Sequence, residues 1–190
     1  MTKSELRKIY LEKRKNLSES EILRLSEKIF ENFISKFQPT ENQNVHIFLS
    51  IKKRREIHTP IFMDYFFENK IKVFVPKIVG NTLISIELTP ETKFIVNSWG
   101  ISEPETDEDS GVKNFDFVIA PLLYCDDFGN RIGYGKGFYD RFFAEINSNA
   151  KKIGVNFFNP SEKIDDISDF DVRLDYLVTP AETLSFTGLE

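Results

Sequence analysis

Residues 130–141, NRIGYGKGFYDR, constrain the fold of this chain more than any other stretch. The apolar run at 116–120 (DFVIA) precedes them and predicts a buried strand, and residues 139–146 have the composition of a helix. Backbone amides of a glycine loop between a strand and a helix can converge on a phosphate. The stretch therefore favours an α/β fold with an anion site at this loop.

The side chains in and around this loop fit the same interpretation. Lys136 supplies a point charge between two glycines, Arg131 offers a planar fork for phosphate oxygens, and Asp140 offers the hard oxygen ligands that Mg²⁺ prefers. The loop is neither a P-loop nor a dinucleotide fingerprint, because Asn130 and Phe138 stand where those motifs need glycine. The alternative is an ordinary tight loop whose glycines serve only geometry.

The remaining pattern alternates helices with strands, which predicts a mostly parallel sheet flanked by helices. A helix is expected over 3–15, and a second follows the capping box of Ser18 and Glu21 and runs to about residue 37. A third should have Thr59 as its N-cap and Pro60 at its first position. Strands are expected over 45–49, 72–75 (ended by Pro76), 83–88, 116–120, 152–157 and 176–178.

Length and composition set the class of protein. The 190 residues predict one domain, 1–190, with a three-layer, Rossmann-like α/β fold. A net charge of −5 argues against general nucleic-acid binding. No stretch is apolar enough for a membrane span, the charged N-terminus does not resemble a secretory signal, and the single cysteine, Cys125, suits a reducing cytoplasm. We expect a cytoplasmic monomer in which Cys125 is either a buried thiol or a nucleophile.

The first predicted helix carries charge on one side. Leu6, Ile9 and Tyr10 form an apolar stripe, and Lys3 and Arg7, four residues apart, share the basic face. This face is either a solvated surface or a clamp for a polyanion.

Read together, these segments resemble the 5-formyltetrahydrofolate cyclo-ligase family over nearly the whole chain. The resemblance is carried by Lys3 and Arg7 (K-x-x-x-R), the Lys13–Arg14 pair, FLS…EIHT at 48–59, VPK at 75–77, SWGISEP at 98–104, GNRIGYGKGFYD at 129–140, and D-x-x-L-D at 171–175. It implies that ATP and 5-formyltetrahydrofolate give 5,10-methenyltetrahydrofolate, ADP and phosphate, with Mg²⁺ bound and a phosphorylated formyl group as the intermediate.

The resemblance also assigns roles to residues, with Lys136 and Arg131 as the catalytic pair. ATP would contact Lys3, Ser4, Glu5, Leu6, Arg7, Arg14, Arg131, Gly133, Tyr134, Gly135, Lys136, Gly137, Phe138 and Tyr139. Folate would contact Leu49, Glu56, Trp99, Tyr134, Gly135, Lys136, Gly137 and Phe138, and Mg²⁺ would be held by Asp140 and Asp171.

Several alternatives stay open at this point. Trp99 is either a core residue or a stacking surface, Asp171 is either a metal ligand or a turn residue, and the basic loop 52–55 can add contacts to an anionic part of the substrate. A different ATP-dependent kinase or ligase on the same fold is the second candidate function. A nucleotide-binding regulatory protein without catalysis is the third.

Overall fold

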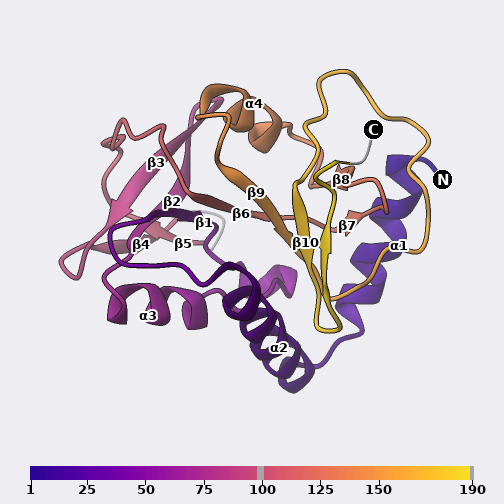
Figure 1. The fold of residues 1–190 in the computed structure, drawn as a ribbon, viewed down its shortest axis with the longest axis horizontal. Helices are drawn as coiled ribbons and strands as arrows, with labels where there is room; N and C mark the ends of the chain where they lie inside the picture. Colours follow the sequence, from indigo (N-terminus) through magenta and orange to yellow (C-terminus); the bar gives the residue numbers. More distant parts are fainter. Residues whose placement is uncertain (98–100, 189–190) are drawn as a thin grey trace.

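The computed structural model describes residues 1–97 and 101–188, which form a seven-stranded, mostly parallel sheet with helices on both sides (Figure 1). The strand order is β11-β10-β9-β6-β1-β2-β3, and only the edge strands β3 and β11 run antiparallel to their neighbours. The α/β prediction is thus confirmed. The strands are β1 (Asn44–Ile47), β2 (Lys72–Val79), β3 (Thr82–Leu88), β6 (Phe117–Pro121), β9 (Lys151–Val155), β10 (Tyr176–Val178) and β11 (Thr183–Ser185).

Alternate residues of the central strand β6 enter two separate cores. Phe117 and Ile119 pack with α2 (Glu19–Phe37) and α3 (Pro60–Glu68), whereas Val118 and Ala120 pack on the side of α4 (Phe138–Glu145). Figure 1 shows α2 and α3 below the sheet and α4 above it. This is the predicted three-layer arrangement. Within the described residues, no helix combines the length and the apolar character needed to cross a membrane.

Helix α1 (Lys3–Lys15) lies outside these layers and covers a short hairpin of β7 (Tyr124–Cys125) and β8 (Arg131–Ile132). Leu6 and Tyr10 are buried against the hairpin, and the ring of Tyr10 stacks on that of Tyr124 with centroids 4.3 Å apart. The predicted burial of Ile9 is wrong, since 37% of that residue is exposed, and Arg14 is buried instead.

Three local predictions concern helix caps and a proline in the first turn of a helix. The capping box is confirmed, because the Ser18 and Glu21 side chains each accept from the other's backbone amide. Thr59 is the N-cap residue of α3 as predicted, but its side chain makes no capping hydrogen bond, because its hydroxyl accepts from the amide of Ser50 at 3.1 Å. Pro60 does occupy the first turn of α3.

The predicted end of β2 at Pro76 is also wrong, because the strand continues to Val79. The ladder between β1 and β2 ends at the pair His46–Phe74, and beyond it β2 is paired only with β3. Proline is tolerated at such an edge because no second ladder needs its missing amide hydrogen. The remaining short elements are β4 (Phe94–Val96) and β5 (Ser102–Pro104), which form a two-stranded ribbon, and the 3₁₀ turn η1 (Lys52–Arg54).

Candidate active site

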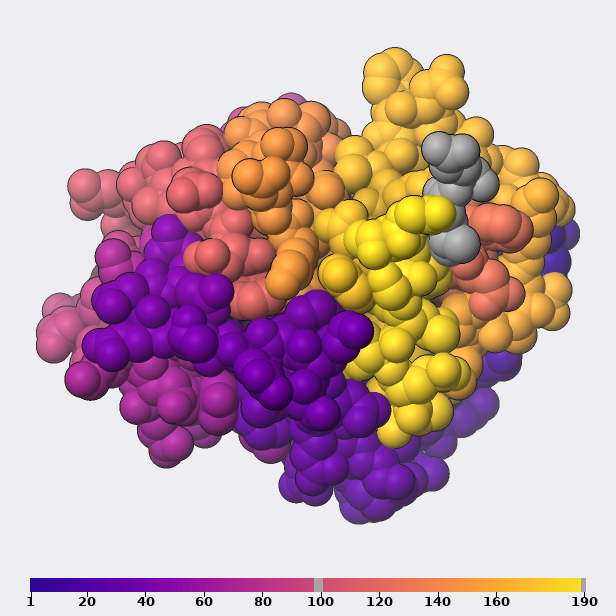
Figure 2. Space-filling model, in the orientation of Figure 1, coloured from indigo at the N-terminus to yellow at the C-terminus, as the bar shows by residue number. Residues whose placement is uncertain are grey.

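A cavity of about 1780 Å³ opens at the carboxyl ends of β1, β2 and β6. It exceeds the roughly 300–1,000 Å³ typical of a site for one small ligand, so it has room for two. Figure 2 shows a notch in the outline between α4 and the segment that precedes β10, two of the elements that line the cavity. Its walls also include α1, the loop after β1, the ribbon β4–β5 and the glycine loop.

The glycine loop, residues 133–137, lies at this edge of the sheet, although the β7–β8 hairpin separates it from β6 in the sequence. Gly135 and Gly137 have φ of +85° and +65°, a region that residues with a Cβ rarely adopt. A Cβ on Gly135 would project to 3.6 Å from the guanidinium of Arg7, and one on Gly137 to 3.2 Å from Arg141. The positive φ angles favour glycine at both positions, and the missing side chains leave the loop backbone, called the cradle below, open beside these cations.

Helix α1 carries three cations whose partners belong to the walls of this cavity or lie just behind them. Lys3 forms an ion pair with Asp171, Arg7 donates from Nε to the carbonyl of Gly133 at 3.0 Å, and Arg14 donates to the hydroxyl of Tyr134 at 3.1 Å. Lys3 and Arg7 line the cavity, whereas Arg14 is buried behind it and also donates to the Leu122 carbonyl at 2.6 Å. Eleven residues of helix span about 16 Å, so the cations mark out the length of the site.

The other residues predicted on α1 do not line the cavity. The Glu5 carboxylate closes a capping box with Thr2, and Leu6 is fully buried in the core beneath the helix. Ser4 is exposed and lies outside the cavity wall. Of the first five predicted ATP contacts, the structure brings only Lys3 and Arg7 to the site.

The two predicted metal ligands, Asp140 and Asp171, both line the cavity and lie on neighbouring segments, because the amide of Val172 donates to Asp140 Oδ1 at 3.1 Å. Burial raises the pKa of Asp171, whereas hydrogen bonds from Lys3 and from the Ser168 amide lower it. Together the lowering effects are larger, so the pKa of Asp171 lies below its ordinary value.

One oxygen of each carboxylate, Asp140 Oδ2 and Asp171 Oδ1, has no hydrogen bond within 1–97 and 101–188. No group of three or more metal-binding side chains occurs in those ranges. Two carboxylates fit Mg²⁺, which usually takes one or two protein carboxylates and completes its shell with phosphate and water.

Arg131, predicted as a direct phosphate contact, lines the cavity and is also engaged with neighbouring protein groups. Its guanidinium is 6% exposed, donates to Asp140 Oδ1 at 2.7 Å and to the Val172 carbonyl, and lies 4.8 Å from the ring centroid of Phe143. Burial lowers the pKa of Arg131 even though Asp140 opposes this shift. In this geometry Arg131 fixes the position of Asp140.

Lys136, by contrast, is free to act. Its side chain is exposed at the cavity wall, and within the described residues its ammonium makes no hydrogen bond or ion pair. It stands between two glycines of the cradle, so its charge is available to a ligand in the cavity.

The opposite end of the cavity is formed by Glu56, which is 6% exposed. Its carboxylate accepts from the hydroxyl of Tyr134 at 2.5 Å and from the Ile51 amide at 2.8 Å. Burial raises the pKa of Glu56 above its ordinary value, although both hydrogen bonds oppose this shift. Leu49 and Arg54 line the same wall, and the Arg54 guanidinium lies 4.4 Å from the ring centroid of Tyr134.

The sequence suggested that the basic loop 52–55 adds contacts to an anionic part of the substrate. In the structure, its side chains point to different surroundings. Arg54 faces the site, whereas Lys52 pairs with Glu19 at 3.4 Å and Arg55 donates to the Leu17 carbonyl. A sequence of consecutive positive charges carries no signal that would single out Arg54.

Three predicted aromatic residues remain. Phe138 and Tyr139 line the cavity, and the Arg141 guanidinium lies 5.1 Å from the ring centroid of Phe138. The Tyr139 hydroxyl is buried, and within the described part of the chain it has no hydrogen bond. Trp99 lies outside the described residues, while Asn97 and Ile101 on either side of that gap line the cavity.

The cysteine and the two histidines lie outside the cavity. His46 is fully buried, its ring centroid is 4.5 Å from that of Phe142, and burial lowers its pKa to about 3. Cys125 is the buried thiol of the two alternatives, and burial raises its pKa. His58 is exposed and does not line the cavity. The cavity therefore offers charge, amides and carboxylates.

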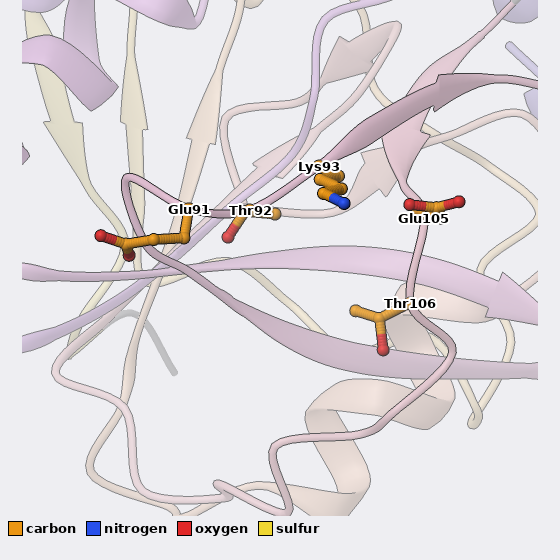
Figure 3. A pocket seen from close by; sticks show the side chains of 5 residues that line it. All are labelled: Glu91, Thr92, Lys93, Glu105 and Thr106. Atoms are coloured by element: carbon orange, nitrogen blue, oxygen red, sulfur yellow. The ribbon is translucent and has the colours of Figure 1, made fainter.

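A second, smaller pocket of about 340 Å³ lies where the β3–β4 turn meets the chain after β5 (Figure 3). It is lined by Glu91, Thr92, Lys93, Glu105 and Thr106 and shares no residue with the predicted site. We therefore place the site in the large cavity.

Known proteins resemble this chain along its full length. Residues 1–180 match the 5-formyltetrahydrofolate cyclo-ligase family. The 5-formyltetrahydrofolate cyclo-ligase of Mycoplasma pneumoniae is 30% identical over 94% of this chain and 98% of its own. A Caenorhabditis elegans protein named probable 5-formyltetrahydrofolate cyclo-ligase is 29% identical over 97% and 95%. The NMR structure of Aquifex aeolicus 5,10-methenyltetrahydrofolate synthetase superposes with a TM-score of 0.84 at 31% identity, covering 100% of this chain and 95% of that one. The chain therefore belongs to the 5-formyltetrahydrofolate cyclo-ligase family.

Proposed function

We propose that this protein converts 5-formyltetrahydrofolate to 5,10-methenyltetrahydrofolate at the expense of ATP, releasing ADP and phosphate. The observation that carries the proposal is the arrangement at Tyr134, which joins two different subsites. Its hydroxyl holds the buried carboxylate of Glu56, and its backbone continues into the glycine cradle. A carboxylate suits the paired N–H donors of a pterin ring, and the cradle suits phosphate.

The proposed reaction has two steps, and both need charge rather than a protein nucleophile. The formyl oxygen attacks the γ-phosphorus of ATP, the bond to the bridging oxygen breaks, and ADP leaves. The nitrogen at position ten then attacks the formyl carbon and gives up its proton to solvent, the ring closes, and phosphate leaves with the former formyl oxygen. Phosphoryl transfer of this kind depends on positioning and on neutralising negative charge.

Six charged side chains in and behind the cavity have a role in this scheme. Lys136 meets the phosphoryl group as it moves, and Arg7 meets the neighbouring phosphate oxygens across the cradle. Asp140 and Asp171 would hold Mg²⁺, which when bound neutralises phosphate charge. Arg131 keeps Asp140 in place, and Arg14 keeps the Tyr134 hydroxyl directed at Glu56.

One assay separates this function from the two alternatives. Purified protein is mixed with 5-formyltetrahydrofolate, ATP and Mg²⁺, and the near-ultraviolet absorbance of the methenyl product is followed together with phosphate release. We expect one phosphate per ring closed, and no product when ATP is omitted. A stable phosphorylated product without ring closure would identify a kinase, and ATP binding without folate-dependent turnover would identify a regulatory protein.

A further inference from the structure

Phe170 is the most exposed large apolar side chain among the described residues, at 86%. It lies in the segment between β9 and β10, and it lines the large cavity together with Asp169, Asp171 and Val172. A phenylalanine left in water at the rim of a ligand site contributes nothing to the core. Its ring is therefore accessible to a ligand bound in the cavity.

The backbone around Phe170 is fixed in spite of this exposure. The amide of Phe170 donates to Ser168 Oγ at 3.3 Å, and the amide of Ser168 donates to the carboxylate of Asp171 at 2.7 Å. Asp171 is paired with Lys3, and the amide of Lys3 donates to Asp166 at 2.6 Å. The turn is thus tied to the start of α1, which fixes the backbone of Phe170 at the rim of the cavity.

The contacts along α1 give the site a direction. Arg14 is beside Tyr134 and Glu56, Arg7 is beside Gly133 and Gly135, and Lys3 is beside Asp171, in that order along the helix. The phosphoryl group that is transferred must meet the formyl group, so the last phosphate of the nucleotide points toward the Tyr134 end. The base of the same nucleotide then lies beyond Asp171, where Phe170 stands.

We propose that Phe170 is the stacking surface for the purine base of the nucleoside triphosphate. The inference rests on the proposed use of ATP and adds the position of the base. A phenyl ring offers only a π-face and no hydrogen-bonding group, so it binds adenine and guanine alike. The phosphates fix the nucleotide in the site, and the stack adds affinity with little discrimination between purines.

The test measures binding rather than turnover, by titration calorimetry with Mg²⁺ present. The probes are ATP, GTP and inorganic tripolyphosphate, which carries the charge without a base. The proteins are wild type, Phe170→Ala, Phe170→Trp and the control Phe128→Ala, which removes another exposed phenylalanine that does not line the cavity. Substitution of so exposed a side chain should leave the melting temperature unchanged.

We expect Phe170→Ala to weaken ATP and GTP binding by the same factor, roughly 5- to 150-fold, as for loss of a base stack. Tripolyphosphate binding should be unchanged, Phe170→Trp should retain ATP binding, and Phe128→Ala should behave as wild type. Wild-type affinity of Phe170→Ala for ATP would overturn the inference and leave the proposed function standing. Equal loss of ATP and tripolyphosphate would overturn it as well, because the residue would then act on the phosphates. Failure of the wild type to bind ATP or tripolyphosphate would overturn both this inference and the proposed function.

Discussion

Replacement of Lys136 by alanine is the sharpest test of the phosphate cradle. Its side chain is exposed, contacts no partner in the described part of the chain, and lies between two glycines. Removal of such a group changes the free energy of unfolding by no more than about 0.5 kcal/mol. The melting temperature without ligand should therefore equal that of the wild type.

The expected loss in activity follows from what remains after the substitution. Loss of one preorganised contact to developing charge typically costs ~10²–10³-fold in rate. Here Arg7 and the loop amides stay in place on the same cradle, so we expect a loss of at least about ten-fold in kcat/KM for ATP. Lys136→Arg should recover only part, because a planar fork does not replace a point charge.

The assay combines an unliganded melting curve with steady-state kinetics on the same preparation, with ATP varied at saturating folate. Lys93→Ala is the matched control, since Lys93 is also exposed but lines the small pocket. Full activity of Lys136→Ala would refute the reasoning and leave Arg7 and the amides to hold the phosphates. A lower melting temperature would show that the side chain has a structural role.

Three further perturbations address the metal, the core and the folate end. Asp140→Asn and Asp171→Asn should each require more Mg²⁺ for half-maximal turnover, and an unchanged metal titration in both would remove them from the metal site. Gly154→Ala would place a Cβ 2.5 Å from Leu174 Cδ1, so urea unfolding should report a loss of about 1–3 kcal/mol; wild-type stability would mean that the core yields easily. Because burial raises the pKa of Glu56 in the folded state, the native protein holds this proton more tightly than the unfolded chain does. The free energy of unfolding should fall as pH rises from the ordinary value of 4.5 through the folded pKa, and Glu56→Gln should abolish that part of the slope. Identical slopes in the two proteins would contradict the assignment.

The sheet was predictable from sequence because most of its strands contain short apolar runs separated by helical segments. β6 is the clearest case, since both of its faces are buried and every position is apolar. The hairpin β7–β8 was not predictable, because strands of two residues are too short to show a period. The extension of β2 through Pro76 depended on where β1 ends, which only the assembled sheet determines.

The site shows the same division between local and long-range information. Lys3 and Arg7 could be paired from their four-residue spacing on one helix face. The burial of Arg14 could not be predicted from sequence, because its partners Leu122 and Tyr134 are 108 and 120 residues away. Likewise, Arg131 looked like a free phosphate ligand until the fold brought the Val172 carbonyl and Asp140 against it.

The attachment of α1 has a consequence for how the protein forms during synthesis. Its partners follow it by more than a hundred residues, up to the 168 that separate Lys3 from Asp171. At about 5–20 residues per second, a ribosome would take roughly 8 to 34 s to add that length. Helix α1 is made before its partners: the β7–β8 hairpin that it covers follows more than a hundred residues later, and Asp171, the partner of Lys3, comes only with the segment before β10. Contacts between residues so far apart in the sequence form late, so we expect the sheet to fold before the cavity is complete. Hydrogen exchange should show that the amides of α1 lose protection before those of the central strands.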